Sequence, residues 1–97
     1  MIPVKRLEIV VDAPTSVRVT QLLESCGLTG WTLVRGASGA GERGLQASDG
    51  ISDVDSNHLV ITTCAAEELD AVIDQLRTLL SQYGGMCLVS EALWLRH

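Results

Sequence analysis

Three features of this 97-residue sequence predict an α+β fold. Segments typical of strands and helices follow one another in the order strand, helix, strand, strand, helix, strand. The two halves of this order match in type, although they do not form a sequence repeat. A long loop of glycine, small polar residues and carboxylates, residues 35–55, separates the halves. Two strand–helix–strand units in one antiparallel four-stranded sheet, with both helices on one face, make a ferredoxin-like βαββαβ sandwich, which is the fold we expect.

The spacing of apolar residues defines the segments of the first half. Residues 4–11 alternate between two faces, as a half-buried strand does. A helix is expected from Pro14 to Cys26, because proline is tolerated in a first helical turn and apolar residues then recur at helical spacing. Gly27 would close this helix. Residues 30–34 are β-branched or aromatic, which predicts a second strand.

The second half is defined in the same way. Residues 57–63 are rich in β-branched side chains and predict a third strand. Thr63 or Cys64 is expected to cap the second helix, which has a long apolar stripe and ends at Tyr83 before two glycines. Residues 86–94 predict the fourth strand.

One face of the predicted sheet has no helix to cover it. We assign Val10, Val60 and Val89 to this face, which is apolar enough that packing against neighbouring subunits is expected. The core is aliphatic and lacks phenylalanine altogether. Association with further copies of the chain would bury more apolar surface.

Composition and charge exclude several classes of protein. The formal net charge of −5 and the lack of a Lys/Arg cluster argue against a nucleic-acid-binding protein. No run approaches the roughly eighteen apolar residues of a membrane helix, and the N-terminus has no signal-peptide core, so we expect no membrane span and a cytoplasmic protein. Cys26, Cys64 and Cys87 have no metal-binding spacing and are expected to be buried small apolar residues.

The loop contains a pattern suited to anions. Gly39, Gly41 and Gly44 surround Arg43, so that backbone N–H groups can turn toward an anion while the guanidinium adds a charged hydrogen bond. A phosphate is the natural candidate. The alternative is a flexible surface loop with a solvated arginine, because long loops are either functional or disordered.

Several short motifs resemble those of PII-like signalling proteins, in particular the group associated with carboxysomes and bicarbonate transport. The motifs are Gly30-Trp-Thr-Leu-Val34, Gly39-x-Gly41-x-Arg43, Ser52-Asp-Val-Asp55, and Ser90-Glu-Ala-Leu-Trp with Arg96-His97. The resemblance covers nearly the whole chain and implies a single domain, residues 1–97, with a flexible T-loop at about 36–56. It also implies a homotrimer that binds adenine nucleotides in three clefts between subunits.

The resemblance implies a set of nucleotide-binding residues: Gly36, Ser38, Gly39, Gly41, Arg43, Leu95, Arg96 and His97. It implies ADP or AMP as regulatory ligand, with ATP and bicarbonate as further candidates, and a bicarbonate transporter or carboxysome-related protein as partner. The loop has no tyrosine for modification, and no Gly-Asp-Gly-Lys segment follows the second helix. These departures favour AMP or ADP over ATP and weaken the case for 2-oxoglutarate.

Other functions find less support in the sequence. No nucleophile has an adjacent base and no set of three metal ligands stands out, so we expect neither an enzyme nor a metal site. Arg35 could contact phosphate, but a pair with Asp53 or Asp55 is favoured, and His58 is expected to be a charge partner of nearby carboxylates. The alternative function is a ligand-free interaction module that docks onto a partner through its acidic loop.

Overall fold

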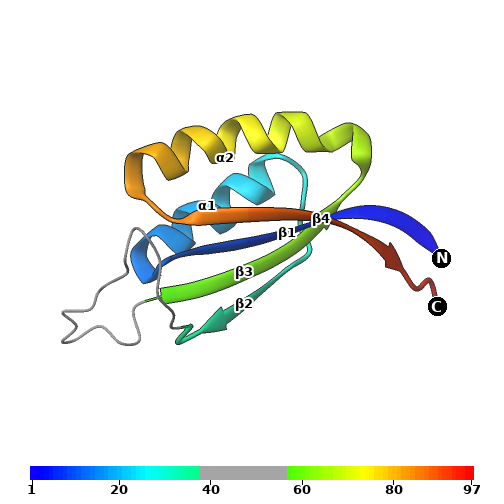
Figure 1. The fold of residues 1–97 in the computed structure, drawn as a ribbon, viewed down its shortest axis with the longest axis horizontal. Coiled ribbons are helices and arrows are strands. Elements are labelled where there is room, and N and C mark those ends of the chain that lie inside the picture. Colours follow the sequence, from blue (N-terminus) through cyan, green and yellow to red (C-terminus); the bar gives the residue numbers. More distant parts are fainter. Residues whose placement is uncertain (38–56) are drawn as a thin grey trace.

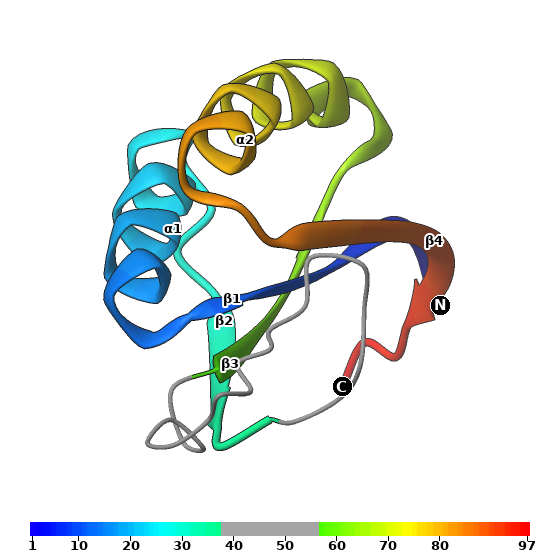
Figure 2. The same cartoon turned by 60° about the vertical axis from the view of Figure 1, so that its left-hand side comes forward.

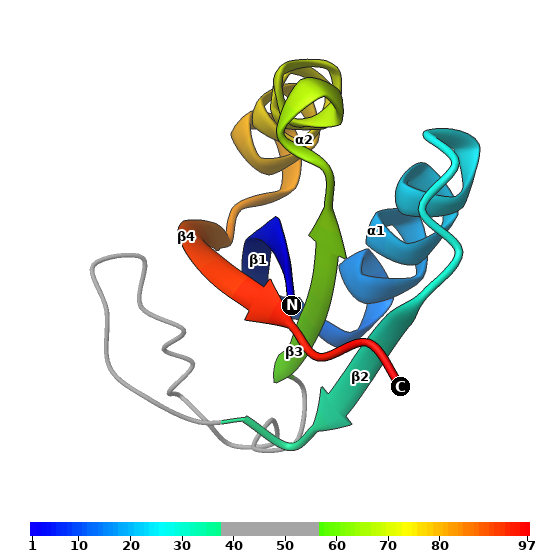
Figure 3. The same ribbon diagram turned by 90° about the vertical axis from the view of Figure 1, so that its right-hand side faces the viewer.

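The computed structural model describes residues 1–37 and 57–97, and these form the expected ferredoxin-like arrangement (Figure 1). In chain order the elements are β1 (Ile2–Asp12), α1 (Ala13–Ser25), β2 (Trp31–Arg35), β3 (Asn57–Cys64), the 3-10 helix η3 (Ala66–Glu68), α2 (Leu69–Tyr83) and β4 (Met86–Trp94). The strands form an antiparallel sheet of order β2-β3-β1-β4. Both helices lie on one side of it, as Figures 2 and 3 show from two further directions.

The core lies between the helices and one face of the sheet. Its buried members come from β1, α1, the segment after α1, β3 and α2: Leu7, Ile9, Val11, Val19, Leu23, Leu28, Val60, Cys64, Val72 and Leu76. They are almost all aliphatic, as the composition predicts. Of the three cysteines, Cys64 is buried as expected, whereas Cys26 and Cys87 are only partly buried, and all three are free thiols.

The register of the sheet corrects the assignment of two residues to the uncovered face. Val60 is opposite Ile9 and fully buried beneath the helices, and Val89 is opposite the buried Leu7. Directly paired residues of antiparallel strands share a face, so Val60 and Val89 both belong to the helix side. Only Val10 was assigned correctly. Alternation along a strand shows which residues share a face, but it does not show which of the two faces meets the helices.

The uncovered face is nevertheless strongly apolar. Leu59 and Ile61 of β3 lie on it beside Val10, and Leu88 of β4, on the same face, is 53% exposed. An ion pair on this face joins Arg6 Nη2 and Glu8 Oε2 at 2.7 Å. A sheet face of this kind, left open to water in one chain, is a surface suited to association.

The two helices begin in different ways. The Asp12 carboxylate caps α1 by accepting the Thr15 N–H at 2.9 Å. The cap predicted for the second helix was wrong, because Thr63 and Cys64 are still part of β3. There the Glu68 side chain reaches back to the Ala65 N–H at 2.8 Å, and α2 starts after a short 3-10 turn.

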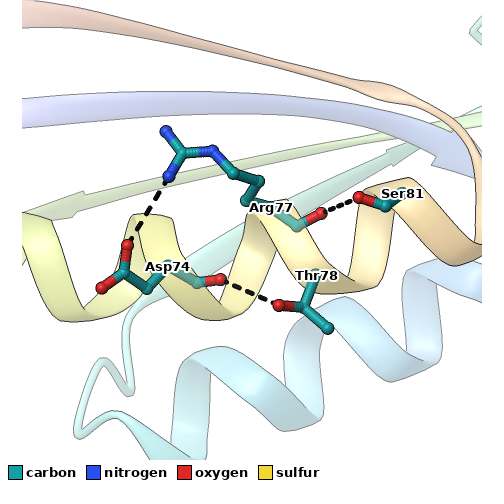
Figure 4. A network of polar contacts seen from close by, with 4 residues as sticks. All are labelled: Asp74, Arg77, Thr78 and Ser81. Carbon is teal, nitrogen blue, oxygen red and sulfur yellow. Dashed lines mark hydrogen bonds and ion pairs between the residues drawn. The ribbon is translucent and has the colours of Figure 1, made fainter.

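The outer surface of α2 is polar and exposed (Figure 4). Thr78 and Ser81 donate to the carbonyl groups of Asp74 and Arg77, at 3.3 and 2.7 Å. Arg77 Nη1 lies 3.6 Å from Asp74 Oδ1, and both side chains are more than 70% exposed. Such an exposed pair adds little stability. In the described residues no helix is long and apolar enough to cross a membrane.

Gly85, in the turn between α2 and β4, sits where no side chain fits. A Cβ there would lie 2.7 Å from the Val10 carbonyl oxygen and 2.7 Å from Val11 Cγ1. Its φ of +112° is also a backbone conformation that L-residues rarely adopt. Gly27 offers a comparison, because its φ is +89° but a Cβ there would meet nothing within 4 Å.

We therefore expect Gly85→Ala to destabilise the protein more than Gly27→Ala does. Both substitutions force alanine into a left-handed conformation, at a cost of about 1–2 kcal/mol, and only Gly85→Ala adds a steric term of about 1–3 kcal/mol. Urea unfolding at one protein concentration measures the difference. Equal midpoints for the two variants would show that the turn can move away from β1.

Candidate functional site

The base of the loop is formed by the last residues of β2 and the first residues of β3. Gly36 follows β2 with φ of +73°, a value that glycine adopts without strain. The next residue, Ala37, donates its N–H to the Asn57 carbonyl oxygen at 2.9 Å. The chain is thus held together where it leaves β2 and where it enters β3. Gly36, a predicted site residue, lies at this base.

His58 links the loop base to the first turn of α1. Its Nδ1 lies 2.9 Å from Ser16 Oγ, and Ser16 is only 2% exposed. The sequence suggested that His58 would be a charge partner of loop carboxylates, and the structure gives it a neutral partner on a helix. The Ser16 hydroxyl also donates to the Ala13 carbonyl oxygen at 2.7 Å, so this buried oxygen makes two hydrogen bonds.

Arg35 is directly opposite His58 in the β2–β3 register. Both side chains therefore lie on the helix side of the sheet, with Arg35 exposed and His58 partly buried. The expected partners of Arg35, Asp53 and Asp55, lie outside the described residues.

The remaining predicted site residues fall into two groups. Ser38, Gly39, Gly41 and Arg43 lie outside the described part of the chain. Leu95, Arg96 and His97 follow β4 and are exposed.

These C-terminal residues lie at the end of the sheet opposite to the loop base (Figure 1). The strand register gives the distance between the two ends of the sheet. On β1, Val10 is opposite Met86 at the loop end, and Ile2 is opposite Trp94 at the other end. At about 3.3 Å per residue, these two positions on β1 are about 26 Å apart. Within one subunit, Gly36 and Arg96 are thus too far apart to bind the same small ligand.

The turn at Gly84 and Gly85 lies at the same end of the sheet as Gly36. Their φ values are +90° and +112°, and β4 starts immediately afterwards. Consecutive residues of this kind can present backbone N–H groups to an anion. The prediction from sequence treated the two glycines only as the end of α2. Their position at the same end of the sheet as the loop base, although on the opposite edge, was not evident from the chain alone.

Two described cysteines, Cys87 toward the loop end of the sheet and Cys64 toward the other end, are not reactive nucleophiles. Cys87 follows the turn, and burial raises the pKa of its thiol. Burial, assisted by the charge of Glu68, also raises the pKa of the Cys64 thiol. Both thiols therefore stay protonated and unreactive at neutral pH. No cluster of three metal-ligating side chains occurs in residues 1–37 and 57–97.

The chain is similar to known proteins in its sequence and in its fold. A family model described as "Nitrogen regulatory protein P-II" matches residues 4–97. Comparison with curated protein sequences gives no match.

Solved structures of similar fold include two PII-like proteins. CPII from Thiomonas intermedia K12, solved with ADP, AMP and bicarbonate, has a TM-score of 0.81 and 22% identity, over 97% of this chain and 90% of that one. A PII-like signalling protein from Thermus thermophilus has a TM-score of 0.77 and 20% identity, over 97% and 91%.

A third structure, the GlnK–ATP complex of B. subtilis, has a TM-score of 0.66 and 23% identity, over 95% of this chain and 84% of that one. At these identities the structural likenesses establish the shared fold.

We expect Ser16→Ala to destabilise the protein by about 1–2 kcal/mol, because it leaves His58 Nδ1 without its partner in a partly buried place. Ser25→Ala is the matched control: Ser25 also donates to a carbonyl within α1, but it is exposed. Its loss is expected to stay within about 0.5 kcal/mol. Urea unfolding compares the two. An equal loss for both would mean that the Ser16–His58 bond does not hold the loop base to α1.

Proposed function

The chain belongs to the P-II family of nitrogen regulatory proteins, and from this premise we propose that it is a homotrimeric sensor of adenine nucleotides. Proteins of this family are regulatory rather than catalytic. In the proposal, residues 1–97 are one subunit, and nucleotide binds in three clefts between neighbouring subunits.

The separation of the site residues is the observation that carries this proposal. Gly36 and Arg96 lie at opposite ends of the sheet, and these ends are about 26 Å apart as measured along β1 from Val10 to Ile2. A nucleotide can contact both only when one comes from each of two subunits. In that arrangement the loop base and the Gly84–Gly85 turn of one subunit would meet Leu95, Arg96 and His97 of the next.

The uncovered face of the sheet supports the trimer. Val34, Leu59 and Leu88 project from three of its strands, and Val34 and Leu88 are 43% and 53% exposed in the single chain. Burial of such side chains contributes about 25 cal/mol per Å². Three sheets facing a common axis would remove this surface from water.

The turn after α2 favours a short phosphate chain. Tyr83-Gly84-Gly85-Met86 can offer backbone N–H groups but has no lysine to neutralise a third phosphate. Ser38, Gly39, Gly41 and Arg43 are proposed to complete the phosphate contacts from the loop. We therefore favour ADP or AMP over ATP. The CPII complexes with ADP, AMP and bicarbonate support this choice, and they make bicarbonate a candidate second ligand.

The loop of residues 36–56 is proposed to carry the signal. A nucleotide that binds one arrangement of the loop better than another shifts the population toward it by its difference in affinity. The surface offered to a partner then depends on the adenylate state. A bicarbonate transporter or a carboxysome-related protein in the cytoplasm is the partner we propose.

Calorimetry with AMP, ADP and ATP tests the nucleotide site. Micromolar binding is expected for ADP or AMP, and Arg43→Ala is expected to weaken it about tenfold or more, because a charged hydrogen bond to phosphate contributes about 1.5–3 kcal/mol. Arg77→Ala, on the exposed surface of α2, is the control and is expected to bind as the wild type does. Absence of binding by all three nucleotides would favour the ligand-free interaction module instead.

Light scattering with size-exclusion chromatography tests the trimer. Leu88→Lys places a charge on the uncovered face while leaving it opposite Glu8, with which it can pair in a folded monomer. This variant is expected to be a monomer with native circular dichroism and weakened nucleotide binding. Val17→Lys, at a 55% exposed position of α1, is expected to remain trimeric. A wild-type monomer that binds nucleotide would contradict the intersubunit cleft.

A further inference from the structure

A groove lies between α2 and β4, next to the turn that joins them, and its volume is about 490 Å³. Leu76 of α2 lines it and is only 1% exposed. Met86 and Val89 of β4 also line it and are 46% and 44% exposed. Because β4 is an edge strand, no further strand of the described sheet lies beside the groove. The single chain therefore leaves this groove open.

The groove between α2 and β4 suits an apolar occupant. Its α2 side includes Ile73 and Leu80 in addition to Leu76. The Ser81 hydroxyl, which also lines the groove, already donates to the Arg77 carbonyl oxygen at 2.7 Å. The Arg77 side chain is 72% exposed, so its charged end can stay in water. An apolar side chain would therefore find carbon surface here and would leave no buried polar group without a partner.

The segment that ends β4 is apolar and exposed. The β1–β3 register stops at Lys5, whereas the β1–β4 register continues to Ile2 opposite Trp94, so this pair of strands extends beyond the end of β3. Leu93 and Trp94 are 60% and 58% exposed, and Leu95 is 67% exposed. Trp94 is the largest of these side chains, and a tryptophan in a pocket is a common anchor of protein interfaces.

Trp94 cannot fill the groove of its own subunit. Val89, the groove residue closest to it along β4, is about 17 Å away at about 3.3 Å per residue. The groove and Trp94 nevertheless lie on the same edge strand, because Met86 begins β4 and Trp94 ends it. In the proposed trimer the C-terminal residues of one subunit meet the turn after α2 of the next, so the end of one β4 comes to the start of another. The other tryptophan, Trp31, begins β2 on the opposite edge of the sheet.

We infer that Trp94 of one subunit inserts into the groove between α2 and β4 of the next subunit and anchors the contact between them. Each subunit then offers one tryptophan and one groove, and such head-to-tail contacts can close into a ring. The inference rests on the proposed function and deepens it, because it names the side chain of the second copy that fills the groove. Trp94 directly precedes Leu95, Arg96 and His97, so its insertion would hold these residues at the neighbouring turn. Trp94 is thus a positioning residue for the nucleotide cleft.

Light scattering over a dilution series tests the anchor. Trp94→Ala is expected to raise the dissociation constant of the trimer at least about tenfold, because a buried aromatic anchor contributes much of the binding energy. Its circular dichroism is expected to stay native, since Trp94 is exposed in the single chain. Trp31→Ala, on the opposite edge of the sheet, is the control and is expected to leave the dissociation constant unchanged. An unchanged dissociation constant for Trp94→Ala would overturn the inference.

Val89→Phe tests the groove from the other side. The larger side chain would occupy the groove within its own subunit, so this variant is expected to weaken the trimer as Trp94→Ala does. The double variant is expected to be no weaker than either single variant, because both changes remove the same contact. Val17→Phe, at a 55% exposed valine of α1 that does not line the groove, is the matched control and is expected to remain trimeric. Additive losses in the double variant would place Trp94 somewhere other than the groove.

Fluorescence reports the surroundings of Trp94 directly. The chain has two tryptophans, so Trp31→Phe leaves Trp94 as the single emitter. In the trimer its emission is expected at shorter wavelength and with weaker quenching by acrylamide than in the Leu88→Lys monomer, and Val89→Phe is expected to return both to the values of the monomer. A trimer that binds ADP while Trp94 stays exposed to acrylamide would overturn this inference alone. A wild-type monomer that binds no nucleotide would count against the proposed function as well.

Discussion

The register of β1 is the constraint on which the rest of the structure depends. This strand pairs with β3 along one edge and with β4 along the other. Leu7, Ile9 and Val11 consequently point to the helices, and all three are at most 3% exposed. A shift by one residue would exchange the two faces of the strand. This pairing determines which face of the sheet the helices cover and which apolar face stays uncovered. It also determines which residues lie at each end of the sheet.

The sequence predicts the segments well because each depends on local chemistry. Apolar alternation, helical spacing and the glycines after each helix place most elements close to their observed positions. The side that Val60 and Val89 face depends on pairing between strands, which alternation does not encode. The start of α2 was missed because Glu68, three residues downstream of Ala65, supplies the cap.

The candidate site was harder to predict, because its residues are far apart in the sequence. The Ser16–His58 bond joins residues 42 positions apart, and neither residue stands out in its own segment. Gly84 and Gly85 are a usual helix ending, and only the folded sheet shows that they lie at the same end as Gly36, on the opposite edge. Arg96 and its neighbours resemble family residues, yet only the folded chain shows that they lie at the far end of the sheet. The resemblance to the family therefore suggests site residues, and the structure shows where the described ones lie.

The pairing of β1 with β4 also has a consequence for synthesis. Of the four strands of this sheet, β1 leaves the ribosome first and β4 last, and Ile2 is opposite Trp94. Until β4 emerges, β1 keeps one edge without a partner, and such edges can pair with other chains. The sheet is thus completed only after β4 has emerged. Chains translated from the same messenger RNA would meet while this edge of β1 is still unpaired. At that stage, correct assembly of subunits competes with wrong pairing between strands.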